Sequence, residues 1–157
     1  MGLIRGALAG AVATWVMDQV TQAMLDAQPA AVTAREEAAR VGGQGSVPNL
    51  VDRLERALGL RLGGTEKDTA AQAIHYALGV VPGAMYGLLR HRVPLLGAGG
   101  GLVYGFSLWV LADEYANVAL GLSGPPEAYP TETHLRGLVG HLVLGAITDS
   151  GIDLLGG

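Results

Sequence analysis

The sequence predicts an all-helical integral membrane bundle of four transmembrane helices, with an amphipathic surface helix in the first long loop. Half of the 157 residues are hydrophobic and the mean hydropathy is +0.35. Only 15% of the residues are charged, where soluble domains carry about 25%. Four long apolar segments set the number of expected spans, which are residues 2–25, 70–89, 95–116 and 132–155.

Charge and residue content disfavour several other classes of protein. The net charge is −4 and no basic stretch is interleaved with aromatic residues, so we expect no nucleic-acid partner. The absence of cysteine excludes disulfides, zinc–thiolate sites and thiol nucleophiles. The glycine run GAGGG (97–101) follows a turn and not a strand, unlike a dinucleotide fingerprint. No catalytic motif is visible, so an enzyme is not favoured.

The first segment, residues 2–25, is long enough to span a bilayer. An alternative is a cleaved secretory signal, but Asp18 interrupts the apolar half and Arg5 is the only basic residue. A retained span is the favoured interpretation. The chain is then one membrane domain, multi-pass in the bacterial inner (plasma) membrane, and its loop charges leave the orientation open.

Residues 26–69 form a polar insert, with six of the ten Lys and Arg and seven of the fourteen acids. Within it, residues 46–59 predict an amphipathic helix that Ser46 caps and Gly59 ends. Asp52 and Arg56 should pair on its polar face. We expect this helix to lie on the bilayer surface or to cover the bundle, and residues 30–40 to form a shorter one. The apolar stripe comprises Val47, Leu50, Val51, Leu54 and Leu58.

The second and third segments are joined by RHRVP (90–94), a turn tight enough for an antiparallel hairpin. A longer Pro- and Gly-rich turn precedes the fourth segment. Every segment carries small residues at four-residue spacing, which permit close packing of helix backbones. These rows are Gly2, Gly6 and Gly10; Gly79, Gly83 and Gly87; Gly97, Gly101 and Gly105; and Gly137 with Gly145.

Two motifs occur twice. The first and third segments contain G-x3-G-x7-D, ending at Asp18 and Asp113, and the second and fourth contain H-x2-L-G, starting at His75 and His141. The pattern predicts two glycine-packed hairpins related as a repeat. Gene duplication and chance agreement among glycine-rich helices are both left open.

The repeat places Asp18, His75, Asp113 and His141 at a similar depth, where they should converge. An ionisable side chain inside a span costs about 2.5–3.5 kcal/mol, so it needs a partner or a water-filled cavity. Four interpretations follow: helix–helix hydrogen bonding alone, a divalent transition metal, a b-type haem with His75 and His141 as axial ligands, or a proton path. The candidate metal ligands are Asp18, His75, Asp113, Glu114, His134 and His141.

From residue 74 onward the chain resembles the YagU-like family of small bacterial inner-membrane proteins. The resembling stretches are IHYALGVVPGAMYGLL (74–89), the glycine-rich start of the third segment, GLSGPPEAYP (121–130) and GHLVLG (140–145). The resemblance implies an inner-membrane location and a part in stress or acid tolerance. Within this resemblance, His75 and His141 are the positions that correspond to the family, and no role is assigned to them.

The function expected from these patterns is a membrane-embedded binding or transport-accessory protein for a metal, haem or protons. The alternative is a structural subunit of a larger membrane complex, in which the polar residues only hold the helices in register. The expected partners are the lipid bilayer and either further copies of the chain or that larger complex.

Overall fold

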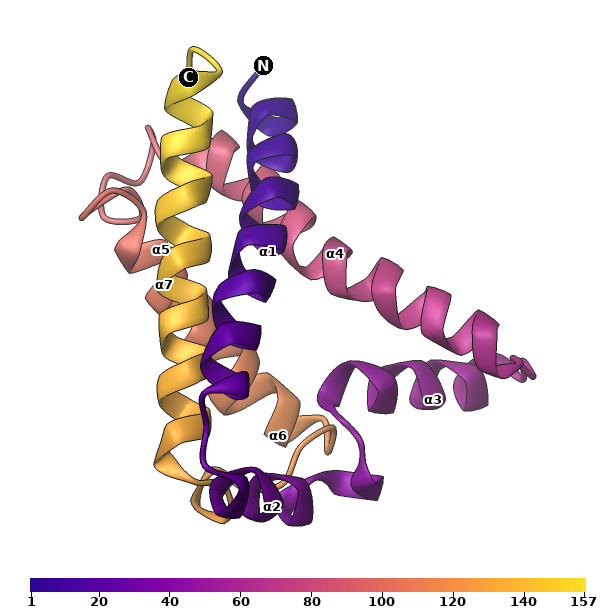
Figure 1. The fold of residues 1–157 in the computed structure, drawn as a ribbon. Coiled ribbons are helices and arrows are strands. Elements are labelled where there is room, and N and C mark those ends of the chain that lie inside the picture. The colour runs from indigo at the N-terminus through magenta and orange to yellow at the C-terminus, as the bar shows by residue number, and fades with distance from the viewer.

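In the computed structural model, which describes residues 1–157, every regular element is helical (Figure 1). Three long helices dominate the fold, and shorter helices connect them. The long helices are α1 (Gly2–Asp26), α4 (Gly64–Leu89) and α7 (Thr131–Leu154). The shorter ones are α2 (Ala30–Ala39), η1 (Val41–Gly43), α3 (Ser46–Leu58), α5 (Leu102–Leu108), the π-helix η2 (Trp109–Ala116), α6 (Asn117–Ala119) and η3 (Pro126–Ala128).

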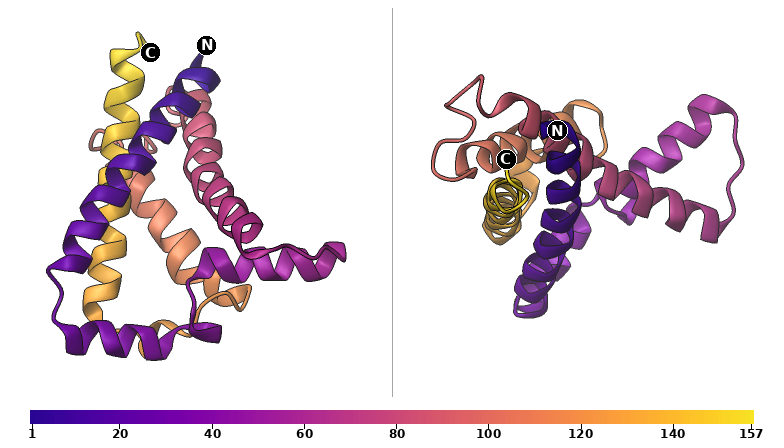
Figure 2. Two further views of the ribbon diagram at one scale, coloured as in Figure 1. Left: turned by 45° about the vertical axis from the view of Figure 1, so that its right-hand side comes forward. Right: turned by 90° about the horizontal axis from the view of Figure 1, so that it is seen from above.

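The long helices cross and do not form a parallel bundle. Helices α1 and α7 lie side by side and run in opposite directions, so both termini are at one end of the molecule (Figures 1 and 2). Helix α4 packs on α1 but diverges from it, and its first turns extend away from the body with α3 beneath them. Helix α5 packs on α7. The divergence leaves space between α4 and the η2–α6 segment, where the candidate site lies.

The expected membrane bundle is wrong. No helix is both long enough and apolar enough to cross a bilayer. The sequence patterns misled because polar residues fall within the helices, as with Arg5 and Asp18 in α1. Helix α4 also begins at Gly64, six residues before the expected segment, and so includes Glu66, Lys67 and Asp68. Without a helix that could span a bilayer, the expected multi-pass location in the bacterial inner membrane is also wrong.

The third expected segment, residues 95–116, is not one helix. Residues 90–101 form turns, in which Gly99, Gly100 and Gly101 have φ of +67°, +65° and +85°. L-residues rarely adopt this left-handed conformation, whereas glycine adopts it readily. The glycines expected to pack a helix therefore break it here, and the α-helix that follows is only seven residues long.

The glycine rows do mediate helix packing in both predicted pairs. Between α1 and α4, a Cβ added at Gly83 would lie 2.7 Å from the Gly6 carbonyl oxygen and 3.0 Å from the Cα of Gly10. Between α5 and α7, a Cβ at Gly145 would lie 2.9 Å from the Cα of Gly105. Such distances exclude any side chain, so the two backbones touch directly.

A small core lies where the long helices cross. Tyr86 of α4 and Tyr104 of α5 stack there with ring centroids 4.4 Å apart. Arg90 closes this end by binding Asp149 at 2.8 Å, and Asp149 also accepts the Tyr86 hydroxyl at 2.5 Å. The other buried core residues are Ala9, Ala13, Leu144 and Ile152.

Both helices expected in the insert are present, as α2 and α3. Gly59 ends α3 in a left-handed conformation, as predicted, but Ser46 is its first helical residue and makes no capping bond. Asp52 does not pair with Arg56; it binds Lys67 of α4 at 2.8 Å. This bond and that of Asn49 to the Leu122 carbonyl, at 2.8 Å, hold α3 against α4 and the loop after α6.

Candidate ligand-binding site

The six ionisable residues singled out in the sequence form three histidine–carboxylate pairs. Each pair joins two elements that are distant in sequence, either α4 to α1 or α7 to η2. The pairs are His75–Asp18 (Nε2 to Oδ1, 2.8 Å), His134–Glu114 (Nδ1 to Oε1, 2.6 Å) and His141–Asp113 (Nδ1 to Oδ2, 3.5 Å).

These pairs do not merge into a metal site. No group of three or more His, Cys, Asp or Glu side chains could hold a metal ion. Because no helix could serve as a span, the expected membrane-embedded binding protein is wrong. The alternative, a structural subunit of a larger membrane complex, also required spanning helices, so it is wrong for the same reason. The roles of His75 and His141 as haem ligands and of the polar residues as a proton path stay predictions.

The repeated motifs make equivalent contacts. In each half, the two glycines pack together and the aspartate eight residues further along approaches the histidine of the partner helix. The matching contacts are Gly10–Gly79 with Gly105–Gly145, and Asp18–His75 with Asp113–His141. The histidine of the second pair is less exposed, since 11% of the His141 side chain is accessible against 35% of His75.

The π-helix η2 presents Trp109, Asp113 and Glu114 to α7. π-Helical turns are rare and occur frequently at functional sites. A Cβ added at Gly137 of α7 would lie 3.2 Å from both Asp113 Oδ2 and Trp109 Nε1. A glycine at this position therefore lets the carboxylate and the indole approach the α7 backbone.

The tautomer of His141 follows from its hydrogen bond. Nδ1 lies 2.9 Å from the Gly137 carbonyl oxygen, which can only accept, so Nδ1 carries the proton. In the neutral ring, Nε2 then bears a lone pair, and it makes no hydrogen bond within the protein. His141 thus offers an acceptor to a ligand.

Asp113 is the carboxylate of the three pairs whose charge is least well compensated. Burial raises its pKa, the negative charge of Glu114 raises it further, and the two neighbouring histidines oppose the effect. The side chain nevertheless keeps 39% of its surface accessible, because it faces open space within the protein. It is surrounded by protein on most sides, yet a small molecule can reach it.

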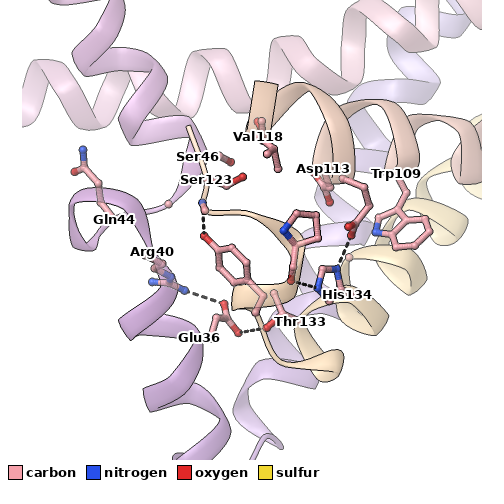
Figure 3. A pocket seen from close by; sticks show the side chains of 17 residues that line it. Glu36, Arg40, Gln44, Ser46, Trp109, Asp113, Val118, Ser123, Thr133 and His134 are labelled. Atoms are coloured by element: carbon pink, nitrogen blue, oxygen red, sulfur yellow. Dashed lines mark hydrogen bonds and ion pairs between the residues drawn. The ribbon is translucent and has the colours of Figure 1, made fainter. Parts of the chain in front are cut away.

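Two cavities meet at Asp113. The first is polar, about 230 Å³ in volume, and lies between α2, η2 and α7 (Figure 3). The second is mostly apolar, about 340 Å³, and lies between α1, α3, α4, η2 and α7. Asp113, Asn117 and Ser46 line both of them.

The apolar cavity has the composition of a small-molecule site. Its apolar wall includes Met17, Leu50, Leu78, Leu108 and Leu144. Its polar groups are few: Asp113, His141, His75, Thr14, Ser46 and Asn117. No lysine or arginine lines it. Ligand pockets in proteins are usually apolar with a small number of placed polar groups, as here.

The polar cavity holds two internally paired clusters. His134 bonds through both nitrogens, with Nε2 3.0 Å from the Pro126 carbonyl (Figure 3). Burial lowers the pKa of His134, but the bonds to Glu114 and Pro126 outweigh it, so the pKa is raised. Glu36 binds Arg136 at 2.6 Å and Arg40 at 3.0 Å. Burial raises the pKa of Glu36, but these arginines lower it overall.

No protein-family model, curated protein or solved structure matches this chain. The resemblance to the YagU-like family therefore stays a prediction.

Several site residues carry no sequence signal. Glu36, Arg136 and Asn117 stand in no recognisable motif, and their approach depends on how α2 and α6 fold beneath the long helices. Trp109 also stands in no recognisable motif, and it lines the polar cavity beside Asp113. The π-helix that places Trp109 has no period that the sequence reveals.

Proposed function

We propose that this protein binds a small, mainly apolar molecule that carries one polar group. The apolar part occupies the 340 Å³ cavity, and the polar group lies against Asp113 and His141. The observation that carries this proposal is an apolar cavity whose wall contains a reachable carboxylate and a histidine nitrogen without a protein partner. Cavities of about 300–1,000 Å³ with such walls are typical of ligand sites.

The arrangement of the helices supports binding between preformed walls. Leu50 and Val47 of α3 form one side of the cavity, and α3 is tied to the loop after α6 and to α4 by the bonds of Asn49 and Asp52. These walls are in place without a ligand. The protein would therefore gain stability on binding, since a ligand that binds only the folded state stabilises it.

The test is calorimetric titration with three eight-carbon probes: 1-octanol, octylammonium and octanoate. We expect saturable binding of at least one probe with one site per chain. Ala112 lines the apolar cavity, so Ala112→Leu should fill it and weaken binding at least tenfold.

The matched control is Ala57→Leu, which adds the same side chain at an exposed position of α3 that lines neither cavity. It separates binding in the cavity from adsorption to exposed apolar side chains. Absence of saturable binding for all three probes, or equal weakening by both substitutions, would contradict the proposed function.

A further inference from the structure

We propose that the polar group of the ligand is a protonated amine, held by Asp113 and His141 at the wall of the apolar cavity. This inference rests on the proposed function and narrows it to one chemical class, an amine with an apolar body. Three observations carry it. The hydrogen-bond donors that line the cavity are largely bonded within the protein, the cavity has one carboxyl group and no lysine or arginine, and that carboxyl group, on Asp113, has no cationic partner of its own.

The hydrogen-bond donors of the cavity are largely used within the protein. The Thr14 hydroxyl donates to the Gly10 carbonyl at 2.8 Å. His141 donates through Nδ1 to Gly137, and His75 donates through Nε2 to the Asp18 carboxylate at 2.8 Å.

What these groups still offer is acceptor capacity: the Thr14 oxygen, Nε2 of His141 and Nδ1 of His75. Only Ser46 and Asn117 keep both donor and acceptor capacity among the polar residues of the cavity. A ligand group that only donates, such as an ammonium with its three N–H bonds, complements this wall. A carboxylate or a phosphate, which only accepts, does not.

The charges of the cavity point the same way. Its only carboxyl group is that of Asp113, and no lysine or arginine lines it. The neighbouring carboxylates have cationic or donating partners of their own: Glu114 has His134, Glu36 has Arg136 and Arg40, and Asp18 has His75. Asp113 has only the His141 ring nitrogen at 3.5 Å, and that nitrogen is committed to Gly137.

Binding is linked to the proton of Asp113. The charged and titratable groups around it are Glu114 on η2 and His134 and His141 on α7. Where Asp113 is protonated, an ammonium that binds takes the place of its proton, and one proton is released to solvent. The affinity for the amine therefore falls as the pH is lowered through the pKa of Asp113, and the affinity for a neutral ligand of the same length does not.

The experiment compares octylammonium, 1-octanol and octanoate by calorimetry on the full chain. We expect octylammonium to bind at least tenfold more tightly than 1-octanol, and octanoate to bind most weakly. Asp113→Asn should abolish the preference for octylammonium over 1-octanol. Asp26→Asn is the matched control, because Asp26 is exposed and lines neither cavity, and it should keep the preference.

The outcomes separate the two proposals. Equal binding of octylammonium and 1-octanol, tighter binding of octanoate, or a preference that survives Asp113→Asn would overturn the amine assignment and leave the binding function standing. Failure of all three probes overturns both. If Asp113→Asn does not fold, the pH series on the unaltered protein decides, and a pH-independent ratio of the two affinities between pH 4 and pH 8 overturns the assignment.

Discussion

At the residue scale, protonation is the property that distinguishes the three histidine–carboxylate pairs. Asp113 has a raised pKa and is held near a histidine whose proton is already donated elsewhere. His134 also has a raised pKa, but it carries both protons between two acceptors. Asp113 and Glu114 are neighbours in one π-helix but differ in their bonding. The carboxylate of Asp113 remains available to a ligand, whereas that of Glu114 is bonded to His134.

The raised pKa of Asp113 predicts its effect on stability. A carboxyl whose pKa is higher in the folded state stabilises the protein fully below its unfolded value of 3.8, and loses this contribution as the pH rises through the folded pKa. Asp113→Asn avoids that loss. We expect its melting temperature at pH 7 to exceed that of the unaltered protein by about 1–3 °C, with no excess near pH 3.5. Thermal unfolding followed by circular dichroism at the two pH values measures this; a lower melting temperature at pH 7 contradicts it.

The raised pKa of His134 predicts a pH dependence of the same sign, starting from a higher unfolded pKa. Its contribution is present below the unfolded value of 6.5 and is lost as the pH rises through the higher folded pKa. We expect His134→Gln to lower the free energy of unfolding by about 1–2 kcal/mol at pH 6, because a charge-assisted bond to Glu114 is lost. Urea unfolding at pH 6 and pH 9 should show a smaller difference at pH 9. A difference that grows with pH would show that His134 is neutral in the folded protein.

At the element scale, glycine sets how closely the helices approach, and its spacing determines which pairs form. The rows on α1 and α4 bring two backbones into contact, so the helices cross at their glycines and diverge towards His75 and Asp18. That divergence is what opens the apolar cavity. Helix α4 reaches it through Leu78 and Pro82, and α7 through His141 and Leu144.

Gly6→Ala tests the crossing of α1 and α4. The new Cβ would overlap the Gly83 carbonyl and lie 3.1 Å from the Ala84 Cα, both of which are backbone atoms that cannot rotate away. We expect a loss of about 1–3 kcal/mol, measured by urea unfolding. Gly64→Ala is the control, because nothing lies within 4 Å of a Cβ there, and it should cost nothing measurable. Equal stability of the two variants would show that the helices do not touch at Gly6.

At the scale of the whole molecule, a few ion pairs fasten the short helices to the long ones. Glu36 of α2 binds Arg136 of α7, and only 5% and 14% of these side chains are accessible. Lys67 fastens α3 to α4 through Asp52 and Glu55.

Several large apolar side chains of α1 and α4 stay exposed on the outside, Leu8 and Val81 among them. The expected association with further copies of the chain stays a prediction, and light scattering of the purified protein measures it.

Glu36→Gln tests the attachment of α2. It leaves Arg136 without its anionic partner, and breaking a buried ion pair costs about 3 kcal/mol. Since arginine lowers the pKa of Glu36, this stabilisation is present above the unfolded value of 4.5 and is lost as the pH falls through the folded pKa. Urea unfolding at pH 7 should therefore show the full loss. The exposed neighbour substitution Glu37→Gln should show almost none, and similar losses in both variants would contradict a specific role for Glu36.

The sequence by itself determined the three long helices, the two helices of the insert and the glycine-packed helix pairs. Glycines every four residues predicted the contacts of α1 with α4 and of α5 with α7, because backbone approach requires small residues at helical spacing. Apolar periodicity and Gly59 predicted α3. The repeated motifs predicted that Asp18, His75, Asp113 and His141 converge, and the structure instead forms the separate pairs Asp18–His75 and Asp113–His141.

Only the tertiary structure decided the environment of those elements. Composition indicated a membrane bundle, but apolar content alone does not distinguish a spanning helix from one interrupted by polar residues and glycine turns. The π-helix, the fold of α2 and α6 beneath the long helices, and the cavities that meet at Asp113 all depend on contacts between residues far apart in the chain. Such contacts leave no periodicity in the sequence, so the space around Asp113 emerges only when the helices are packed.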